Sequence, residues 1–289
     1  MEKEEFVKNY QVLQSLILDS VRNGTSFSMQ GHDVDELKSV AREIATEILA
    51  GNFDVLYQPQ VHFDGQVKSA EAYLGQYLHG VDVDRRVIAF IARTNNFEEK
   101  LSKLFLEKIC LDLQGITKAL GGDYMVMFTM NPQYFNDEFC KYYCETLIQN
   151  KLKPENVGIE FLESSSFDGV TVELMEKLKS LGTKFILDGY GMASTQGELL
   201  KYPFDYVKIS EDITENINLS DEHQQVVEDL MRSYHRNFKI VADGVKTKEE
   251  YETLQNLSFR MIQGYVFSNI FSKEELIEKS STVSKGFAQ

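Results

Sequence analysis

Apolar and polar positions along the chain follow two periods, and each period predicts a different kind of element. From Glu4 to Arg22 and from Val34 to Leu49, apolar residues recur every three or four positions, which predicts two amphipathic helices. From residue 53 the pattern changes, because the stretches 53–63 and 66–78 alternate apolar and polar residues on either side of Asp64-Gly65. This arrangement predicts a hairpin-like pair of antiparallel strands.

The rest of the chain alternates short apolar runs with stretches of helical spacing. The apolar runs predict buried strands at residues 124–130, 157–164, 185–187, 206–209, 238–242 and 259–265. Helical spacing predicts helices at residues 82–93, 98–119, 137–147 and 221–236, with a further short helix between residues 188 and 206. Strands that alternate with helices in this way predict an α/β fold.

The length of the chain allows one large α/β barrel domain or two small domains. It has 289 residues, of which 43% are hydrophobic and 26% charged, as in an ordinary globular protein. We favour one barrel, with an N-terminal helical extension at residues 1–32, a barrel domain at 33–280 and a polar tail at 281–289. The first helix either packs on the barrel or serves dimerisation or the docking of a partner, and the sequence leaves both interpretations open.

The charge of the chain excludes some classes of partner. A formal net charge of −15 and a pI near 4.8 argue against a nucleic-acid polymer as partner, because such a surface needs a basic stripe. No run approaches the roughly 18 apolar residues of a membrane span, so we expect no membrane segment. Three cysteines without a CxxC pair indicate reduced thiols, and we expect a cytoplasmic protein.

Charged residues in or beside the predicted strands are the first candidates for chemistry. Glu160 lies in the middle of an apolar strand, where a carboxylate is costly unless it is paired or binds a metal. Asp188 follows one apolar run and Lys208 lies inside the next. In a βα barrel such residues form a site at the carboxyl ends of the strands. The alternative is that Asp188 caps a helix and Lys208 is an edge-strand charge.

Six groups of residues between about residues 35 and 278 form a series of motifs. In chain order they are Tyr57-Gln58-Pro59 with Glu71-Ala72, then Asn131, then Glu160-Phe161-Leu162-Glu163, then Leu187-Asp188 with Tyr206-Val207-Lys208-Ile209, then Asp243-Gly244-Val245, and finally Gln263-Gly264-Tyr265. In this order and spacing they resemble the EAL family of cyclic di-GMP phosphodiesterases. The resemblance implies a (β/α)8 TIM-barrel variant whose first strand is antiparallel.

The resemblance also implies roles for the motif residues. The implied metal ligands are Glu71, Asn131, Glu160 and Asp188; the implied catalytic residues are Lys208, Asp243 and Gln263; Gln58, Glu71 and Tyr265 are implied to bind the ligand, and Glu163 to steady the loop after Asp188. Carboxylate and amide oxygens suit Mg²⁺ or Mn²⁺, which are the implied cofactors. For Asn131, the residues without the resemblance favour a turn or a helix N-cap.

The chain departs from the family pattern at several positions, five of which carry or lose a polar or charged group. Gly75 replaces an arginine that grips a substrate phosphate, and Gly189 replaces the second aspartate of a pair. Ser210 replaces an aspartate, Lys246 reverses the charge of a glutamate, and Asp243 is one methylene shorter than the family's glutamate. Because a misplacement on the order of 1 Å can cost ~100-fold in rate, these changes together should abolish efficient turnover.

We therefore interpret the chain as a degenerate EAL domain, inactive or nearly so, and favour a non-enzymatic role. Two such roles stay open: a receptor for cyclic di-GMP, and a regulator that binds a partner protein, with a homodimer as a further candidate assembly. The alternative is a weakly active, metal-dependent phosphodiesterase that yields pGpG. For that alternative we expect Gly189→Asp and Lys246→Glu to raise activity steeply.

Overall fold

A closed barrel of eight strands forms the centre of the computed structural model, which describes residues 2–191, 198–234, 238–257, 259, 261–266 and 268–286. The strands are β1 (Asp54–His62), β2 (Val67–Gly75), β5 (Met125–Thr129), β6 (Val157–Leu162), β7 (Lys184–Tyr190), β8 (Tyr206–Ile209), β9 (Lys239–Ala242) and β10 (Met261–Ile262). Around the barrel they follow the order β1-β10-β9-β8-β7-β6-β5-β2. β1 runs antiparallel to β10, whereas β2 pairs parallel with β5 and each later pair is parallel. The predicted barrel with an antiparallel first strand is confirmed.

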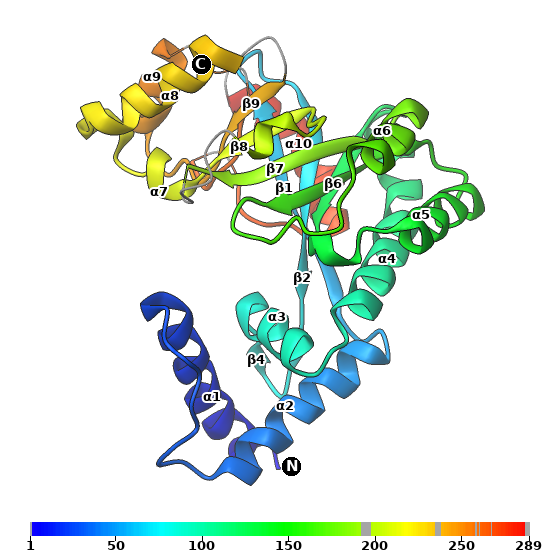
Figure 1. Cartoon of the computed structure of the whole chain (residues 1–289), viewed down its shortest axis with the longest axis vertical. Coiled ribbons are helices and arrows are strands. Elements are labelled where there is room, and N and C mark those ends of the chain that lie inside the picture. Colours follow the sequence, from blue (N-terminus) through cyan, green and yellow to red (C-terminus); the bar gives the residue numbers. More distant parts are fainter. Residues whose placement is uncertain are drawn as a thin grey trace. The chain divides into compact units, whose positions relative to one another are not determined.

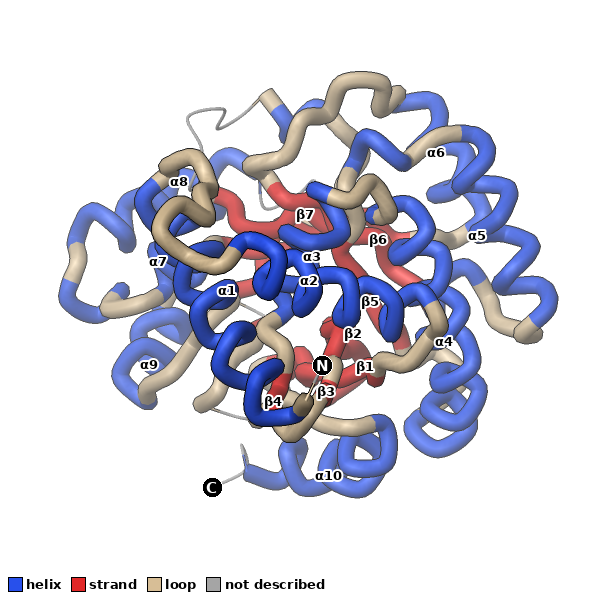
Figure 2. The backbone as a smooth tube through the Cα atoms, turned by 90° about the horizontal axis from the view of Figure 1, so that it is seen from below, coloured by secondary structure: helices blue, strands red, loops and turns tan. Residues whose placement is uncertain are grey.

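Helices precede, connect and follow the strands (Figures 1 and 2). Their bounds are α1 Lys3–Asn23, α2 Val34–Leu49, α3 Arg85–Thr94, α4 Glu98–Leu120, α5 Asp137–Gln149, α6 Val172–Leu181, α7 Glu211–Thr214, α8 Asp221–Tyr234, α9 Lys248–Asn256 and α10 Lys273–Gly286. Short 3₁₀ turns lie at Pro132–Tyr134, Pro154–Asn156, Leu199–Lys201 and Ile217–Leu219. Both views place α4, α5 and α6 on the outer side of β5, β6 and β7. Among the described residues, no helix has the length and apolar character needed to cross a lipid bilayer.

Several predicted boundaries differ from those observed. The last strand is shorter than the predicted stretch 259–265, and α8 ends at Tyr234, while residues 235–237 lie outside the described residues. Two helices, α6 and α9, were not predicted, because few apolar residues mark their inner faces. The apolar residues that α6 buries are Met175 and Leu178. The predicted polar tail overlaps α10, which extends to Gly286.

The chain divides into two compact units. The first comprises Met1–Val55 and Tyr73–Phe105, and the second comprises Leu56–Ala72 and Leu106–Gln289. In the first unit α1, α2 and α3 pack together through the buried side chains of Phe6, Tyr10, Leu13, Ile17, Leu37, Val40, Ile44, Ile48, Val87, Ile88 and Ile91. A short hairpin, β3 (Tyr77–Leu78) and β4 (Val81–Asp82), joins this unit. The domain boundaries expected at residues 33 and 281, and the role of the first helix, stay predictions.

Alternation along the barrel strands separates an apolar layer from a polar one. Met125, Met127 and Ile186 form a buried cluster against Tyr206 inside the second unit. Alternate side chains of a strand share a face. Asp188 therefore lies on the same face of β7 as Ile186, and Lys208 lies on the same face of β8 as Tyr206. The barrel interior therefore changes from apolar to charged toward the carboxyl ends of its parallel strands.

We expect Gly264→Ala to lower the free energy of unfolding by about 3 kcal/mol. Gly264 has a φ angle of 152°, and a Cβ atom there would lie 2.2 Å from the carbonyl oxygen of Val245, a backbone atom with little freedom to move. Gly115→Ala in α4 is the matched control, because a Cβ atom at that position meets nothing within 4 Å. The control should gain up to about 1 kcal/mol of helix propensity. Chemical denaturation measures both, and equal stability of the two variants would contradict the prediction.

Candidate functional site

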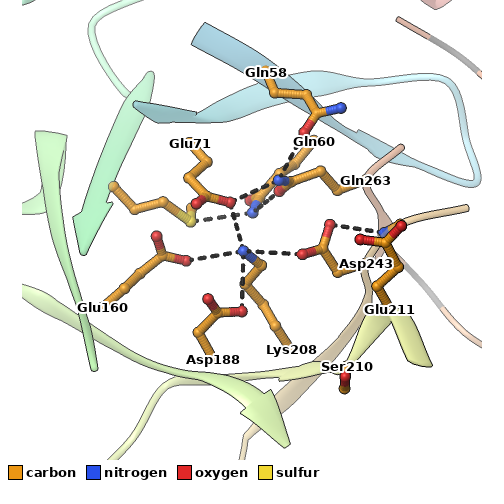
Figure 3. A network of polar contacts seen from close by, with 12 residues as sticks. Gln58, Gln60, Glu71, Glu160, Asp188, Lys208, Ser210, Glu211, Asp243 and Gln263 are labelled. Carbon is orange, nitrogen blue, oxygen red and sulfur yellow. Dashed lines mark hydrogen bonds and ion pairs between the residues drawn. The ribbon is translucent and has the colours of Figure 1, made fainter. Parts of the chain in front are cut away.

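The charged layer of the barrel centres on the ammonium group of Lys208. Its Nζ atom lies 2.5 Å from Glu71 Oε2, 3.2 Å from Asp188 Oδ1, 3.4 Å from Glu160 Oε1 and 3.5 Å from Asp243 Oδ2 (Figure 3). Glu71 comes from β2, Glu160 from β6, Asp188 from β7 and Lys208 from β8, while Asp243 directly follows β9. The structure thus brings five predicted site residues into one cluster, hereafter the Lys208 cluster. Lys208 is not an edge-strand charge, since its side chain is fully buried.

A chain of side-chain amides completes one side of this cluster. Gln263 Nε2 donates to Glu71 Oε2 at 2.7 Å and to Gln58 Oε1 at 3.2 Å, as Figure 3 shows. Gln60 Nε2 in turn donates to Gln263 Oε1 at 2.8 Å, and Gln60 Oε1 accepts from Ser69 at 2.9 Å. Gln263 is therefore held with its amide group toward Glu71. Gln60 was not predicted as a site residue. It lies two residues after Gln58 on β1, so the two side chains share a face of the strand.

The electrostatics of the cluster are dominated by burial and by an excess of carboxylates. Burial raises the pKa of Glu160 well above its usual value, and the negative charge of Glu71 adds to the rise while Lys208 opposes it. Burial likewise raises the pKa of Asp188, and it raises the pKa of Asp243 to about 6 against the opposing effect of Lys208. Burial alone would lower the pKa of Lys208, but the surrounding carboxylates, Asp188 first, raise it well above its usual value. One ammonium faces four carboxylates, so the ionised cluster lacks positive charge.

Glu160 gives the clearest sign that the cluster suits a further cation. Its side chain is fully buried, and neither carboxylate oxygen has a hydrogen-bond partner among the described residues. A buried carboxylate is costly unless a cation compensates it, and the ammonium of Lys208, 3.4 Å from Glu160 Oε1, is shared with three other carboxylates. The donors around it are hard carboxylate oxygens, which are the ligands that Mg²⁺ and Mn²⁺ take. The residues present therefore fit a divalent cation in number and chemistry, although in the described part of the chain the carboxylates converge on Lys208 and not in a metal-ligand arrangement.

Asn131 and Tyr265 are two further predicted site residues. Asn131 Oδ1 accepts a hydrogen bond from the backbone N–H of Gln133 at 3.2 Å, so it caps the 3₁₀ turn at Pro132–Tyr134. The oxygen that would bind a metal is thus engaged in a local turn. Tyr265 is 59% exposed and presents its ring to solvent.

Glu163 and Asp188 frame the start of the loop that follows β7. The backbone N–H of Glu163 donates to the carbonyl oxygen of Asp188 at 2.8 Å, and Glu163 Oε2 accepts from the N–H of Gly191 at 3.1 Å. Glu163 itself is buried. These two bonds hold Gly191 close to the end of β6. The role of Glu163 in steadying the loop stays a prediction. Residues 192–197 of the loop lie outside the described residues.

Apart from Asp243, the positions that depart from the family motifs add no carboxylate to the cluster. Gly189 has a φ angle of 75°, and a Cβ atom there would meet nothing within 4 Å. Lys246 points its Nζ atom at Glu211 and Glu215, at 2.7 and 3.4 Å. Ser210 caps α7 by accepting from the N–H of Asp212, and Gly75 is the last residue of β2.

Comparison with known proteins places these features in a family. The model of the EAL domain family matches residues 41–269. The blue light- and temperature-regulated antirepressor BluF of Escherichia coli is 28% identical over 209 residues, which cover 64% of this chain and 51% of that protein. The cyclic di-GMP phosphodiesterase RocR of Pseudomonas aeruginosa is 22% identical over 258 residues, which cover 86% of this chain and 65% of that protein. The chain therefore spans between half and two thirds of the length of these two relatives.

A solved structure supports the fold independently. The EAL enzyme Bd1971, in a form with cAMP and cyclic di-GMP bound, matches with a TM-score of 0.77 at 20% sequence identity. The match covers 93% of this chain and 74% of that chain. At this identity the likeness shows a shared fold.

In the presence of a chelator, we expect the free energy of unfolding of the protein to fall as pH rises from about 4 to about 8. The fall should be smaller in Asp243→Asn. Because the pKa of Asp243 is raised to about 6, the folded protein binds this proton more tightly than the unfolded chain does. The stabilisation is complete below the unfolded value near ~3.9 and is lost as pH rises through about 6. The amide cannot ionise, so the variant should lose about 1–2 kcal/mol less over this range.

Urea denaturation at several pH values measures this difference. Asp168→Asn, in an exposed loop, is the control for the removal of one carboxylate. If the Asp243 variant and the control show the same pH dependence as the wild-type protein, the protonation of Asp243 does not contribute to folding.

Proposed function

The chain belongs to the EAL domain family, as its motifs predicted, and from this premise we propose that it is a cyclic di-GMP-binding regulator that hydrolyses the dinucleotide slowly or not at all. The observation that carries the proposal is the Lys208 cluster, in which four carboxylates face one ammonium while position 189 has no carboxylate. The cluster favours one added cation and with it an anionic ligand. The missing carboxylate disfavours the hydrolytic step.

The cation would be held by the buried carboxylates. Glu71, Glu160 and Asp188 are the ligands that we propose for Mg²⁺ or Mn²⁺, with Asp243 beside them. When bound, such an ion supplies positive charge that attracts and polarises a phosphate oxygen. Asn131 Oδ1 accepts one hydrogen bond, from the N–H of Gln133, so it would join these ligands through its second lone pair.

The chain's own residues would then bind and orient the dinucleotide. Lys208 keeps its proton in this environment, so its ammonium adds a second positive charge beside the phosphate. Gln263 is held rigidly by Gln60 and Glu71, which fixes the direction of its amide. The exposed ring of Tyr265, two residues further along the chain, offers a face on which a guanine base can stack.

Two features limit hydrolysis. Catalysis by metal ions on phosphodiesters commonly relies on two ions that hold both the attacking and the leaving oxygen. Without a carboxylate at position 189, the second ion loses a ligand that the family motif supplies. Gly75 also lacks the guanidinium fork that binds a phosphate in two places.

The two relatives differ in the kind of function that their names state, one regulatory and one enzymatic. BluF is described as an antirepressor and RocR as a phosphodiesterase. Because this chain spans only part of each of them, its activity and partners are proposals. We favour the regulatory role, and keep slow hydrolysis as the second candidate because Lys208, Asp243 and Gln263 all remain in one connected network.

We expect saturable heat when the purified protein is titrated with cyclic di-GMP in the presence of Mg²⁺, and at least a tenfold loss of affinity in a chelator, because the uncompensated carboxylates repel the phosphates. Chromatography of the same samples should show pGpG forming at least ~100-fold more slowly than with RocR assayed alongside. Glu160→Gln should remove most of the Mg²⁺ dependence. Efficient turnover would replace the proposal with the enzyme alternative, and absence of heat would leave the partner-binding regulator.

The second candidate has its own test in Gly189→Asp. If the protein is a slow phosphodiesterase, the added carboxylate should raise the rate of pGpG formation by about tenfold or more, since space is open there and aspartate tolerates a positive φ better than most residues. Gly31→Asp is the control for backbone strain, because its φ of 86° is similar and its surroundings are also open. A rate that stays at the wild-type level in both variants would exclude this candidate.

A further inference from the structure

The charge of Lys246, opposite to that of the family motif, is matched by its neighbours in space. Its Nζ atom lies 2.7 Å from Glu211 Oε1 and 3.4 Å from Glu215 Oε1. Glu211 is the first residue of α7 and Glu215 directly follows it, whereas Lys246 lies after β9. The lysine therefore links two segments that are about 30 positions apart in the sequence.

Glu211 also packs directly on the backbone next to Asp243. A Cβ atom on Gly244 would lie 2.4 Å from Cγ and 2.7 Å from Cβ of Glu211. Gly244 has a φ angle of 74°, so both space and backbone conformation require glycine there. The stem of Glu211 thus covers the Asp243-Gly244 peptide while its carboxylate reaches Lys246.

The same peptide holds the Asp243 carboxylate in place. The hydroxyl of Thr214, at the end of α7, donates to the carbonyl oxygen of Asp243, and the N–H of Gly244 donates to Asp243 Oδ1 at 2.8 Å. The other carboxylate oxygen, Oδ2, faces Lys208 at 3.5 Å. In Figure 3, Glu211 lies beside Asp243 on the side away from Lys208.

Glu250 fastens the far side of this loop. Its two carboxylate oxygens accept from the backbone N–H groups of Lys246, Thr247 and Asn216, at 2.8, 3.0 and 3.0 Å. Asn216 belongs to the segment after α7, so Glu250 joins the same two segments as Lys246 does. The buried carboxylate of Glu250 makes this part of the loop rigid.

We propose that Lys246 is a positioning residue of the Lys208 cluster. Its ion pairs with Glu211 and Glu215 hold α7 over the Asp243-Gly244 peptide and thereby keep the Asp243 carboxylate directed at Lys208. The charge at position 246 is a compensated change, matched by Glu211 on α7 and by Glu215 directly after it, and not an isolated loss. For its effect on ligand binding the inference rests on the proposed function; for the loop itself it does not.

For Lys246→Glu we therefore expect the opposite of what the family motif alone predicts. The motif treats Lys246→Glu as a restoration that strengthens the site. In this structure the change would place three carboxylates together, at positions 211, 215 and 246, and the attraction would become repulsion. The variant should therefore loosen the loop, and a compensating Glu211→Lys should tighten it again.

Hydrogen exchange of the amides of residues 243–247, followed by mass spectrometry, tests the loop without any ligand. We expect exchange about tenfold faster in Lys246→Glu and about threefold faster in Lys246→Met, because exposed ion pairs are individually weak but reversal adds repulsion. The charge swap Lys246→Glu with Glu211→Lys should return exchange to within about twofold of wild type. Lys248→Glu is the matched control, since this neighbouring lysine is 79% exposed and pairs with Glu252 on its own helix.

The affinity for Mn²⁺, measured by calorimetry on the same variants, should fall and recover in parallel with exchange. The inference is overturned if Lys246→Glu shows the same exchange rates and Mn²⁺ affinity as the wild-type protein. It is also overturned if the charge swap does not restore exchange and affinity while the Lys248→Glu control behaves as wild type. If the wild-type protein does not bind cyclic di-GMP, the proposed function fails, and the exchange data still decide the role of Lys246.

Discussion

The buried ammonium of Lys208 is the interaction on which the rest of the structure depends. Four carboxylates, from Glu71, Glu160, Asp188 and Asp243, approach it from four other parts of the barrel. None of these groups is stable alone in such a place, because a single buried charge is strongly destabilising. The barrel must close for the charges to meet, and the charges must meet for the closed barrel to tolerate them. Fold and site are therefore stabilised by the same contacts.

The protein tolerates these buried charges because its apolar core lies in other layers of the barrel. Met125, Met127 and Ile186 fill the barrel below the charged layer, and Phe135, Phe161 and Phe185 pack edge to face or stacked on the outside, with ring centroids 5.3 to 6.1 Å apart. Alternation along each strand sends one residue to each of these regions. The carboxyl ends of the strands are left free to carry polar groups, as in other βα barrels.

Changes in function within such a fold come from a few positions at the strand ends. In this chain one of these changes is matched by its neighbours in space. Lys246 replaces an acid, yet it lies against Glu211 and Glu215, and the glycine at position 244 gives Glu211 its place. By the family motif alone, position 246 has lost its carboxylate. In the structure, the lysine at this position forms ion pairs with two glutamates of a neighbouring segment.

The sequence by itself determined the α/β pattern and the identity of the charged residues, and its resemblance to the family motifs implied the barrel. Periods of two and of 3.6 residues are local, and a charge such as that of Lys208 within an apolar run stands out without any knowledge of the fold. Only the tertiary structure decided which groups meet. It showed that Gln60 holds Gln263, that Asn131 is engaged in a turn, and that Lys246 pairs with residues of α7. Such contacts join strand ends far apart in the sequence, and their partners are set by closure of the barrel, which no local pattern records.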